Sequence, residues 1–370
     1  MKQILVFGVG RMGTAISYAM KKLGYYVIGV DSNNHAAENF KKHIGHDEGT
    51  FYSCDERDYD ELLVKFNSPE VVISSLPYHQ TQTLAEFCID SGIRYCDLGG
   101  RVDVSQNIND YAQRHAEKPV MTDLGLAPGW VNIVAEQGCS QIHHQVDSVE
   151  MMVGGLPCCF DANPPMNYAC TWSVDGLINE YKDDCEILVD GEIKQEQGME
   201  GLQDVDFKLV NEIMEAFYTS GGASHSIKTM QRRGIKNCFY KTLRYKGHCD
   251  AIRFLIRHCK LKDDELKEIF VKGCPEQPFG DAVFIKVKVV GGDLEFNKEL
   301  IIPHDQNFTA MQRSTAFPIS SVASLMAEGV FDDKIQQNRS GDGKLPSVLS
   351  YGDIPHNEFN ANLKKLDLQF

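Results

Sequence analysis

The chain has 370 residues, of which 42% are hydrophobic and 24% charged, a composition typical of a globular protein with two or three domains. Its formal net charge of −15 repels nucleic-acid phosphates and anionic lipid headgroups, so we expect neither nucleic acid nor a membrane as a partner. No apolar run reaches the ~20 residues that span a bilayer.

The 12 cysteines are expected to be reduced thiols. The apolar run at 4–7 leads directly into a glycine turn without the cleavage site of a signal peptide, so we expect a cytoplasmic protein. The pairs His248-Cys249 and His258-Cys259 have a composition that suits a metal site. Ten residues along a helix rotate by about 1000°, which turns the two pairs about 80° apart. We therefore expect no metal.

The first 122 residues alternate short β-rich runs with helical patterns. Apolar residues recur at helical spacing between these runs, as at Ala15, Ala19 and Leu23. This order predicts an α/β fold with a doubly wound parallel sheet and helices on both faces. The expected strands are Gln3–Phe7, Tyr26–Val30, Thr50–Ser53, Val71–Leu76, Arg94–Asp97 and Pro119–Thr122.

From about residue 145 the apolar residues alternate with a period of two. The runs 185–189 and 192–195 flank Asp190-Gly191, which permits a tight hairpin. A second pair of runs, 283–289 and 294–300, is joined at Gly291-Gly292. These patterns predict an antiparallel sheet with one buried face. Pro318 is expected to open a helix over 319–328, and the tail is expected to end in a short helical run.

Residues 8–13 read GVGRMG, follow a hydrophobic run and open a helical pattern. This GxGxxG arrangement predicts a Rossmann fold that binds a dinucleotide at the positive end of the helix. Gly8 would make the tight turn, Gly10 would let the backbone approach the diphosphate, and Gly13 would permit close helix–sheet packing. The alternative is a structural turn that binds no phosphate.

Asp31 ends the second expected strand, 18 residues after Gly13. A carboxylate in this position accepts the hydroxyls of the adenosine ribose and repels a 2′-phosphate. The following residues 32–34 include no Arg or Lys that would offset this repulsion. The sequence therefore favours NAD over NADP.

Other strand ends are expected to line the same crevice, because ligands bind at the carboxyl ends of such sheets. Taken singly, each of these segments is equally explained as a turn between a strand and a helix. Segments 97–100 and 124–129 are expected near the nicotinamide. The expected cofactor-binding residues are Gly8, Gly10, Arg11, Met12, Gly13, Asp31, Ser32, Cys54, Asp55, Ser74, Ser75, Leu76, Pro77, Leu98, Gly99 and Gly129.

Several short motifs run from the first strand to the tail. They are GVGRMG at 8–13, SSLP at 74–77, YCDLGG at 95–100, GLAPGW at 125–130, TWSVDGLINEY at 171–181, KTLRYKGH at 241–248 and TAMQRSTAFP at 309–318. Together they resemble the saccharopine dehydrogenase and lysine 6-dehydrogenase family. The resemblance implies an NAD-binding Rossmann domain over 1–125 and a substrate domain with an antiparallel sheet over 126–305. It also implies C-terminal helices over 306–370 that pack back on the first domain.

The resemblance implies an NAD-dependent oxidoreductase that acts on the C–N bond of a small-molecule amino acid. Ala127, where the saccharopine branch typically has Asp, favours the lysine 6-dehydrogenase branch, which deaminates the ε-carbon of L-lysine. Trp130 departs from that branch, which usually has a smaller or flexible apolar residue there. The alternatives are a saccharopine or carboxynorspermidine-type reductase and a catalytically silent NAD-binding protein. We also expect a homodimer.

Amine oxidation needs a base that takes a proton from the nitrogen. Asp97 stands at a strand end beside the expected nicotinamide site, and His225 lies in a polar segment and carries the ring that most often exchanges protons near neutral pH. These two residues are the catalytic candidates. A structural role is the alternative for each.

Arg244 and Arg313 lie in motifs that carry the resemblance, and at least one of them is expected to bind the substrate carboxylate, because arginine grips carboxylates bidentately. The alternative is a surface or domain-bridging ion pair. Tyr168, Thr171 and Trp172 occupy the matching part of the second domain and are expected at the substrate. For Trp172 a purely core position is the competing interpretation.

Overall fold

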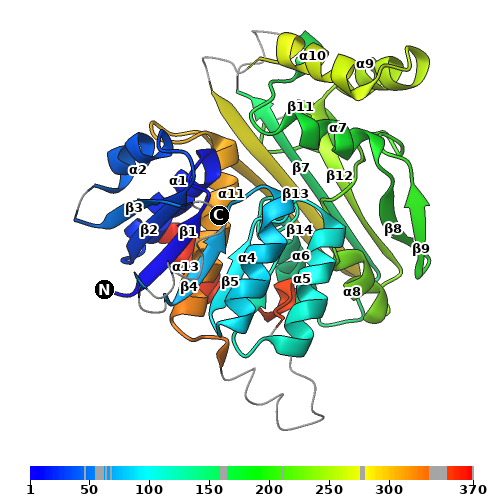
Figure 1. Cartoon of the computed structure of the whole chain (residues 1–370). Coiled ribbons are helices and arrows are strands. Elements are labelled where there is room, and N and C mark those ends of the chain that lie inside the picture. The colour runs from blue at the N-terminus through cyan, green and yellow to red at the C-terminus, as the bar shows by residue number, and fades with distance from the viewer. Residues whose placement is uncertain are drawn as a thin grey trace. The chain divides into compact units, whose positions relative to one another are not determined.

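The computed structural model describes residues 1–45, 47–54, 62, 65–66, 69–158, 165–210, 212–275, 280–332 and 348–368. The chain divides into two compact units, one formed by Met1–Trp130 with Ser314–Phe370 and the other by Val131–Arg313. Each unit is built around one sheet (Figure 1). None of the helices within the described ranges is long and apolar enough to cross a membrane.

The first unit contains a six-stranded sheet in the order β3-β2-β1-β4-β5-β6, and all of its pairings are parallel. The strands are β1 (Gln3–Phe7), β2 (Tyr26–Asp31), β3 (Gly49–Ser53), β4 (Val71–Ser74), β5 (Arg94–Asp97) and β6 (Val120–Met121). This order places the switch point between β1 and β4, where doubly wound sheets bind ligands. The predicted parallel sheet is confirmed.

Within the residues that the structure describes, the helices between these strands include α1 (Arg11–Lys22), α2 (Ala36–Ile44), α4 (Tyr78–Asp90) and α5 (Val102–His115). The central strands are apolar, and Ile4, Leu5 and Val6 have no exposed surface. Burial on both faces is what a parallel sheet covered by helices requires.

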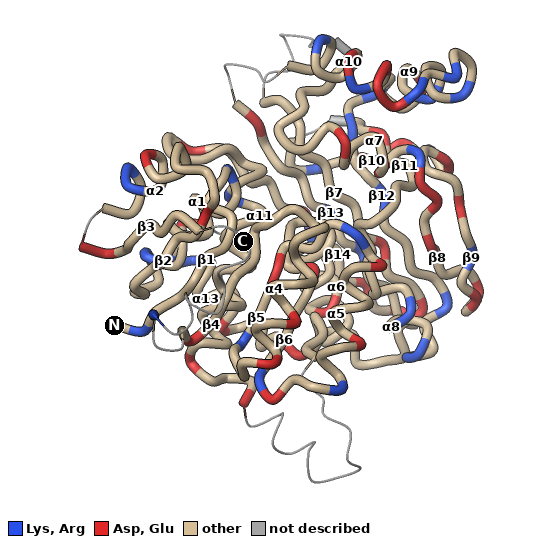
Figure 2. Tube along the Cα trace, in the orientation of Figure 1, with Lys and Arg blue, Asp and Glu red and all other residues tan. Residues whose placement is uncertain are grey.

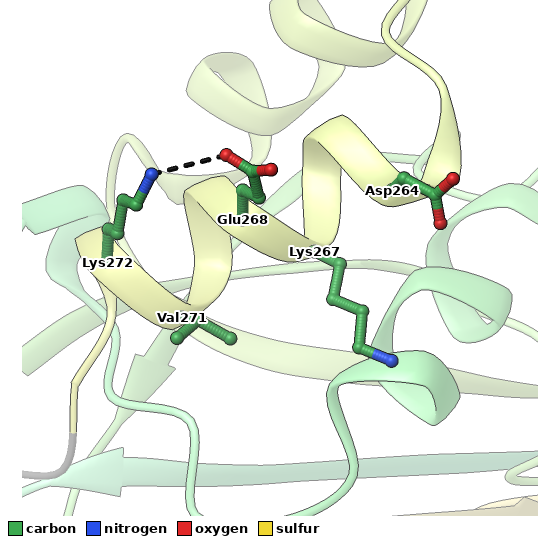
Figure 3. A pocket seen from close by; sticks show the side chains of 5 residues that line it. All are labelled: Asp264, Lys267, Glu268, Val271 and Lys272. Atoms are coloured by element: carbon green, nitrogen blue, oxygen red, sulfur yellow. Dashed lines mark hydrogen bonds and ion pairs between the residues drawn. The ribbon is translucent and has the colours of Figure 1, made fainter.

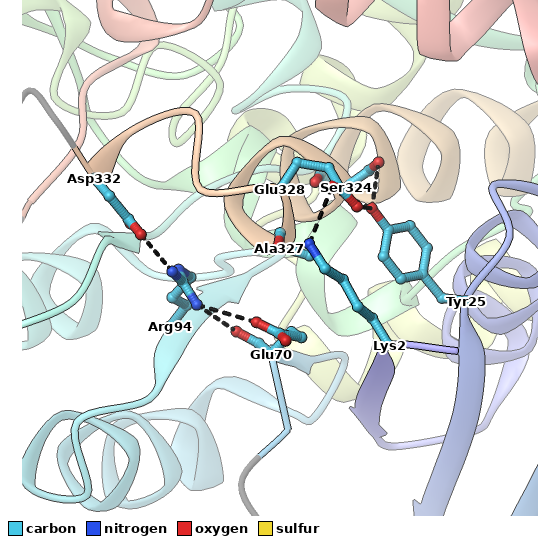
Figure 4. A network of polar contacts seen from close by, with 8 residues as sticks. All are labelled: Lys2, Tyr25, Glu70, Arg94, Ser324, Ala327, Glu328 and Asp332. Atoms are coloured by element: carbon cyan, nitrogen blue, oxygen red, sulfur yellow. Dashed lines mark hydrogen bonds and ion pairs between the residues drawn. The ribbon is translucent and has the colours of Figure 1, made fainter.

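The C-terminal part of the first unit contains α11 (Ala310–Ala327) from Ser314 onward and α13 (His356–Lys365). Polar contacts fix it to residues at the start of the chain (Figure 4). The Lys2 ammonium lies 3.0 Å from the Glu328 carboxylate, and the Tyr25 hydroxyl donates to the same carboxylate at 2.9 Å. Arg94 pairs with Asp332 at 2.6 Å. These contacts join residues that are 238 to 326 positions apart in sequence.

The second unit contains an eight-stranded mixed sheet whose main path is β10-β11-β12-β7-β13-β14. Its strands are β7 (Ser148–Pro157), β8 (Cys185–Val189), β9 (Glu192–Glu196), β10 (Gln203–Phe207), β11 (Glu212–Tyr218), β12 (Asn237–Tyr245), β13 (Asp281–Gly291) and β14 (Leu294–Pro303). The two predicted hairpins, β8–β9 and β13–β14, are both antiparallel. The sheet is not antiparallel throughout, because β12 and β7 run parallel.

Helices cover both faces of this sheet. They are α6 (Trp130–Gln141), α7 (Val174–Lys182), α8 (Ser226–Arg232), α9 (His248–Arg253) and α10 (Asp263–Gly273). Buried aromatic side chains beneath α7 and α10 include Tyr181, Phe217 and Phe270. The surface-facing α10 carries charges of both signs, whereas the central strands β1 and β4 carry none (Figure 2).

The prediction that Pro318 opens a helix is wrong, since α11 begins at Ala310 and contains Pro318. Side chains that cap the N-terminus of α11 determine where this helix begins, and the position of Pro318 in the sequence does not indicate them. The Thr309 hydroxyl accepts the amide of Gln312 at 3.1 Å, and the Gln312 side chain accepts the amide of Thr309 at 3.0 Å. Asp281 also accepts the amide of Ala310 at 2.7 Å. These bonds satisfy the first orphan donors of the helix, so it starts earlier.

Candidate functional site

The glycine turn between β1 and α1 has a different steric demand at each glycine. Gly8 has φ +80°, and a Cβ there would lie 2.7 Å from the Ser75 carbonyl oxygen. A Cβ at Gly13 would lie 1.7 Å from the Gly8 carbonyl oxygen, so the helix approaches the strand as closely as its backbone allows. At Gly10 no atom lies within 4 Å of the added Cβ. The turn therefore leaves open space only where a diphosphate would approach the backbone.

Helix α1 begins at Arg11, and Met12 follows in its first turn. Gly10 supplies no side-chain cap, and the first turn has no acidic residue. No side chain of the first turn therefore neutralises the positive end of the helix dipole, which suits an anionic group.

Asp31 lies beside this turn at the end of β2. One carboxylate oxygen accepts the Val9 amide at 2.7 Å, and the other accepts the Asn33 amide at 2.8 Å. These bonds hold the carboxylate at the carboxyl edge of the sheet, and each oxygen retains a lone pair for a ribose hydroxyl. Ser32 is exposed and Cys54 is half-buried. Asp55, also expected here, lies outside the described residues.

The remaining expected cofactor residues differ in accessibility. Ser74 is only 1% exposed inside β4, whereas Ser75 and Leu76 are half-buried and Pro77 is exposed beyond the strand end. Leu98 and Gly99 are half-buried after β5. Gly129 has φ +130° and packs so closely on the Gly125 backbone that a Cβ would lie 2.1 Å from its oxygen, a structural reason for glycine at this position.

Asp97 is 1% exposed and joins the ends of β5 and β6. Its carboxylate accepts the amides of Gly99 at 2.9 Å and Asp123 at 3.0 Å, and the Tyr95 hydroxyl at 3.1 Å. Burial and the neighbouring Asp123 carboxylate raise the pKa of Asp97 to about 7, although the three hydrogen bonds oppose this rise. Asp97 therefore exchanges a proton near neutral pH while it fixes two strand ends.

Arg244 lies on β12 in the second unit and is 3% exposed. Its Nε donates to the Tyr181 hydroxyl at 2.9 Å, and its Nη1 donates to the Leu243 carbonyl at 2.9 Å. The guanidinium stacks 4.5 Å from the centroid of the Tyr168 ring. Among the described residues no carboxylate lies within ion-pair distance of it. A buried cation without a counter-charge is costly, so this group is suited to an anionic ligand.

His248 extends this arrangement. Its Nδ1 lies 2.8 Å from the Met166 carbonyl oxygen, and its Nε2 lies 2.9 Å from the Tyr181 hydroxyl. Burial lowers the pKa of His248 to about 3, and Arg244 adds repulsion. The ring is therefore neutral, with Nδ1 donating to the carbonyl and Nε2 accepting from Tyr181. That assignment leaves the Tyr181 oxygen free to accept from Arg244.

The expected substrate residues Tyr168 and Trp172 lie together, with the Trp172 indole donating to the Tyr168 hydroxyl at 3.0 Å. Tyr168 is 1% exposed, whereas Trp172 and Thr171 are half-buried. Because Tyr168 also packs on Arg244, the structure brings three of the expected substrate residues into one cluster.

Arg313 and His225 have other surroundings. Arg313 donates to the Pro303 carbonyl at 2.5 Å and lies 3.3 Å from the Asp305 carboxylate. His225 lies at the start of α8, with Nδ1 2.9 Å from the Ser224 hydroxyl. Arg313 is 6% exposed, and its partners Pro303 and Asp305 both lie in the same unit as Arg313 itself.

A surface hollow beside α10 contains none of the expected site residues (Figure 3). It is lined by Asp264, Lys267, Glu268, Val271 and Lys272. All five are exposed, and Lys272 pairs with Glu268 at 3.2 Å. Solvated charges on one helix face carry no argument for catalysis.

The sequence reasoning missed Glu180, Tyr181 and His248 as members of the Arg244 cluster. All three lie within motifs that were quoted for the family resemblance. The motifs therefore contained these residues, but the residues in contact are 62 and 63 positions apart in sequence. The packing of α7 against β12 decides which of them meet.

Comparison with known sequences identifies both parts of the chain. Residues 4–122 match the saccharopine dehydrogenase NADP-binding domain, and residues 125–341 match the saccharopine dehydrogenase C-terminal domain. The mitochondrial alpha-aminoadipic semialdehyde synthase of Rattus norvegicus is 24% identical over 269 residues, which cover 69% of this chain and 28% of that protein. The L-glutamate-forming, NADP(+)-dependent saccharopine dehydrogenase of Pyricularia oryzae is 24% identical over 304 residues, which cover 80% of this chain and 64% of that protein.

The chain thus spans less than two thirds of the length of these curated relatives. Among solved structures, apo histidine-tagged saccharopine dehydrogenase (L-Glu forming) from Saccharomyces cerevisiae has a TM-score of 0.73 at 15% identity. That similarity covers 98% of this chain and 97% of the other, so the two have the same fold. With its NAD(P)-binding domain and its C-terminal domain both matched, this chain belongs to the saccharopine dehydrogenase family.

Proposed function

We propose that this protein is a nicotinamide-dependent oxidoreductase that acts on the C–N bond of a secondary amine joining two amino-acid moieties, as in saccharopine. The observation that carries the proposal is the Arg244 guanidinium, which is 3% exposed and has no carboxylate partner among the described residues. It lies within the part of the chain that matches the C-terminal domain of the family. A substrate carboxylate would supply its missing counter-charge.

The first unit has the features needed to hold the cofactor. The open space over Gly10 and the end of α1 suit its diphosphate, and Asp31 suits its ribose. We propose NAD rather than NADP, because the Asp31 carboxylate would repel a 2′-phosphate. Three fungal relatives are named as NADP(+) enzymes, so the two cofactors are compared directly in the test below.

The bound nicotinamide would supply the acceptor for the hydride that leaves the carbon next to the nitrogen. The amine nitrogen must lose its proton for this step, and water then adds to the resulting imine. Asp97, with its pKa of about 7, and His225 are the proposed proton acceptors. Loss of turnover at unchanged KM in Asp97→Asn or in His225→Gln would identify the base.

Oxidation of the ε-amine of L-lysine is the second candidate, favoured by Ala127 in the GLAPG segment. The comparisons favour the saccharopine-type reaction, because both domain matches and the fungal relative are named for it. A protein that binds NAD without turnover is the third possibility.

Initial rates of NADH and NADPH formation with saccharopine and with L-lysine test the proposal. We expect saccharopine-dependent formation, and we expect Arg244→Lys to raise KM for saccharopine about tenfold or more because a bidentate contact is lost. Arg253→Lys, in an exposed pair with Asp250, is the matched control and should leave KM for saccharopine nearly unchanged. Turnover with lysine alone would favour the second candidate. Cofactor binding without turnover of either amine would overturn the proposal.

A further inference from the structure

Helix α7 lies beside β11 and β12 (Figure 1), and side chains of α7 and β12 form a group of polar contacts. Thr242 and Arg244 are two residues apart on β12, so they point to the same face. The Thr219 hydroxyl, just beyond β11, lies 2.8 Å from the Thr242 hydroxyl. Helix α7 contributes two consecutive residues, since Tyr181 contacts Arg244 at 2.9 Å and Glu180 contacts Thr242 at 2.6 Å.

Glu180 is half-buried, and only one of its carboxylate oxygens is used. Oε1 accepts the hydroxyls of Thr219 at 3.1 Å and Thr242 at 2.6 Å. Oε2 has no hydrogen-bond or ion-pair partner among the residues that the structure describes. The two threonines therefore fix the carboxylate and leave one oxygen available to a donor.

The same cluster thus holds one cation and one anion that do not pair with each other. Arg244 uses Nε and Nη1 and leaves Nη2 without a partner among the described residues. Each charged side chain is held by hydrogen bonds to its own neighbours, Arg244 by Tyr181 and Glu180 by the threonines. Two partly desolvated, opposite charges kept apart in this way match a ligand that carries both charges.

We propose that Arg244 and Glu180 together bind the unreacted α-amino-acid end of the substrate, with Arg244 taking its carboxylate and Glu180 its ammonium group. This inference rests on the proposed function and deepens it, because it assigns substrate specificity to a free α-ammonium group. A ligand without that group leaves the Glu180 carboxylate unsatisfied. A charge-assisted hydrogen bond is worth about 1.5–3 kcal/mol, which corresponds to roughly 10- to 150-fold in affinity.

Calorimetric binding to the full chain without oxidised cofactor tests this assignment in the absence of turnover. The probes are saccharopine and its analogue that lacks the α-amino group of the lysine moiety. Wild type should prefer saccharopine by about 10- to 150-fold. Glu180→Gln should lose that preference by binding saccharopine more weakly, with the analogue unchanged. Arg244→Lys should weaken both probes.

Glutamine at 180 retains the oxygen that accepts both threonine hydroxyls, and an unchanged unfolding midpoint checks that the fold is intact. Asp175→Asn removes an exposed carboxylate from the same helix and is the control expected to bind like wild type. Equal affinities of wild type and Glu180→Gln for saccharopine would overturn the role of Glu180, even if saccharopine turnover supports the proposed function. Oxidation of another amine by a wild type that binds no saccharopine would overturn both.

Discussion

The Tyr181 hydroxyl accepts a 2.9 Å hydrogen bond from Nε of Arg244 and, together with the Leu243 carbonyl and the Tyr168 ring, orients the buried guanidinium. The same hydroxyl lies 2.9 Å from His248 Nε2, so one oxygen serves a cation and a neutral imidazole. Substitution of either partner is therefore expected to disturb the other. The consequence is that α7 controls the geometry of a residue on β12.

Tyr181→Phe should lower the free energy of unfolding by about 1–3 kcal/mol, because it leaves buried donor and acceptor groups unpaired. KM for the substrate should rise, whereas the Kd for the cofactor should stay unchanged. Chemical denaturation and steady-state kinetics measure these effects. Tyr240→Phe is the control, since its hydroxyl has only a 3.5 Å contact with Thr242, and it should cost less than about 0.5 kcal/mol. Equal losses in both variants would contradict the assigned role of Tyr181.

Two alanine substitutions in the glycine turn should affect different properties, one the cofactor affinity and the other the stability of the fold. Gly10→Ala meets open space, so stability should change by less than about 0.5 kcal/mol while cofactor affinity falls about tenfold or more. Gly13→Ala places a Cβ against the Gly8 carbonyl and should destabilise the fold by about 1–3 kcal/mol or more. Unfolding curves and cofactor titrations separate the two. A folded Gly10→Ala variant with wild-type cofactor affinity would argue against a diphosphate at this turn.

Cofactor preference should depend on Asp31. Wild type should have a higher kcat/KM with NAD than with NADP, because the carboxylate repels a 2′-phosphate. Asp31→Ser combined with Ser32→Arg should reverse the preference by removing that repulsion and adding a cation. Ser32→Arg alone keeps the carboxylate and should shift the ratio less. A wild type that uses NADP more efficiently would refute the NAD assignment.

The raised pKa of Asp97 should make stability fall as pH rises. In the unfolded chain its pKa returns to near 3.8, so between about pH 4 and pH 7 the folded state holds a proton that the unfolded state has lost. The Asp97 contribution is fully present below pH 4 and is lost towards pH 7, with a slope of at most about 1.4 kcal/mol per pH unit. Asp97→Asn does not titrate. Denaturation at several pH values should show wild type losing stability relative to the variant across this window, and parallel curves would contradict the prediction.

Elements defined by local patterns could be predicted from the sequence. The β8–β9 hairpin follows from Asp190 and Gly191, whose φ angles of +53° and +82° suit a tight turn. The parallel sheet follows from apolar runs that alternate with helical patterns. The start of α11 could not be predicted in this way, because the Asp281 cap comes from a residue 29 positions earlier.

The sequence by itself determined the glycine turn, the acid at the end of β2 and the change from a parallel to a mostly antiparallel sheet. Each of these depends on residue types and spacings within a few tens of residues. Only the tertiary structure decided that Tyr181 meets Arg244 and that Glu180 meets Thr242, across 63 and 62 residues of chain. The physical reason is that strand register and helix packing set such contacts, and these depend on the whole core rather than on any local pattern.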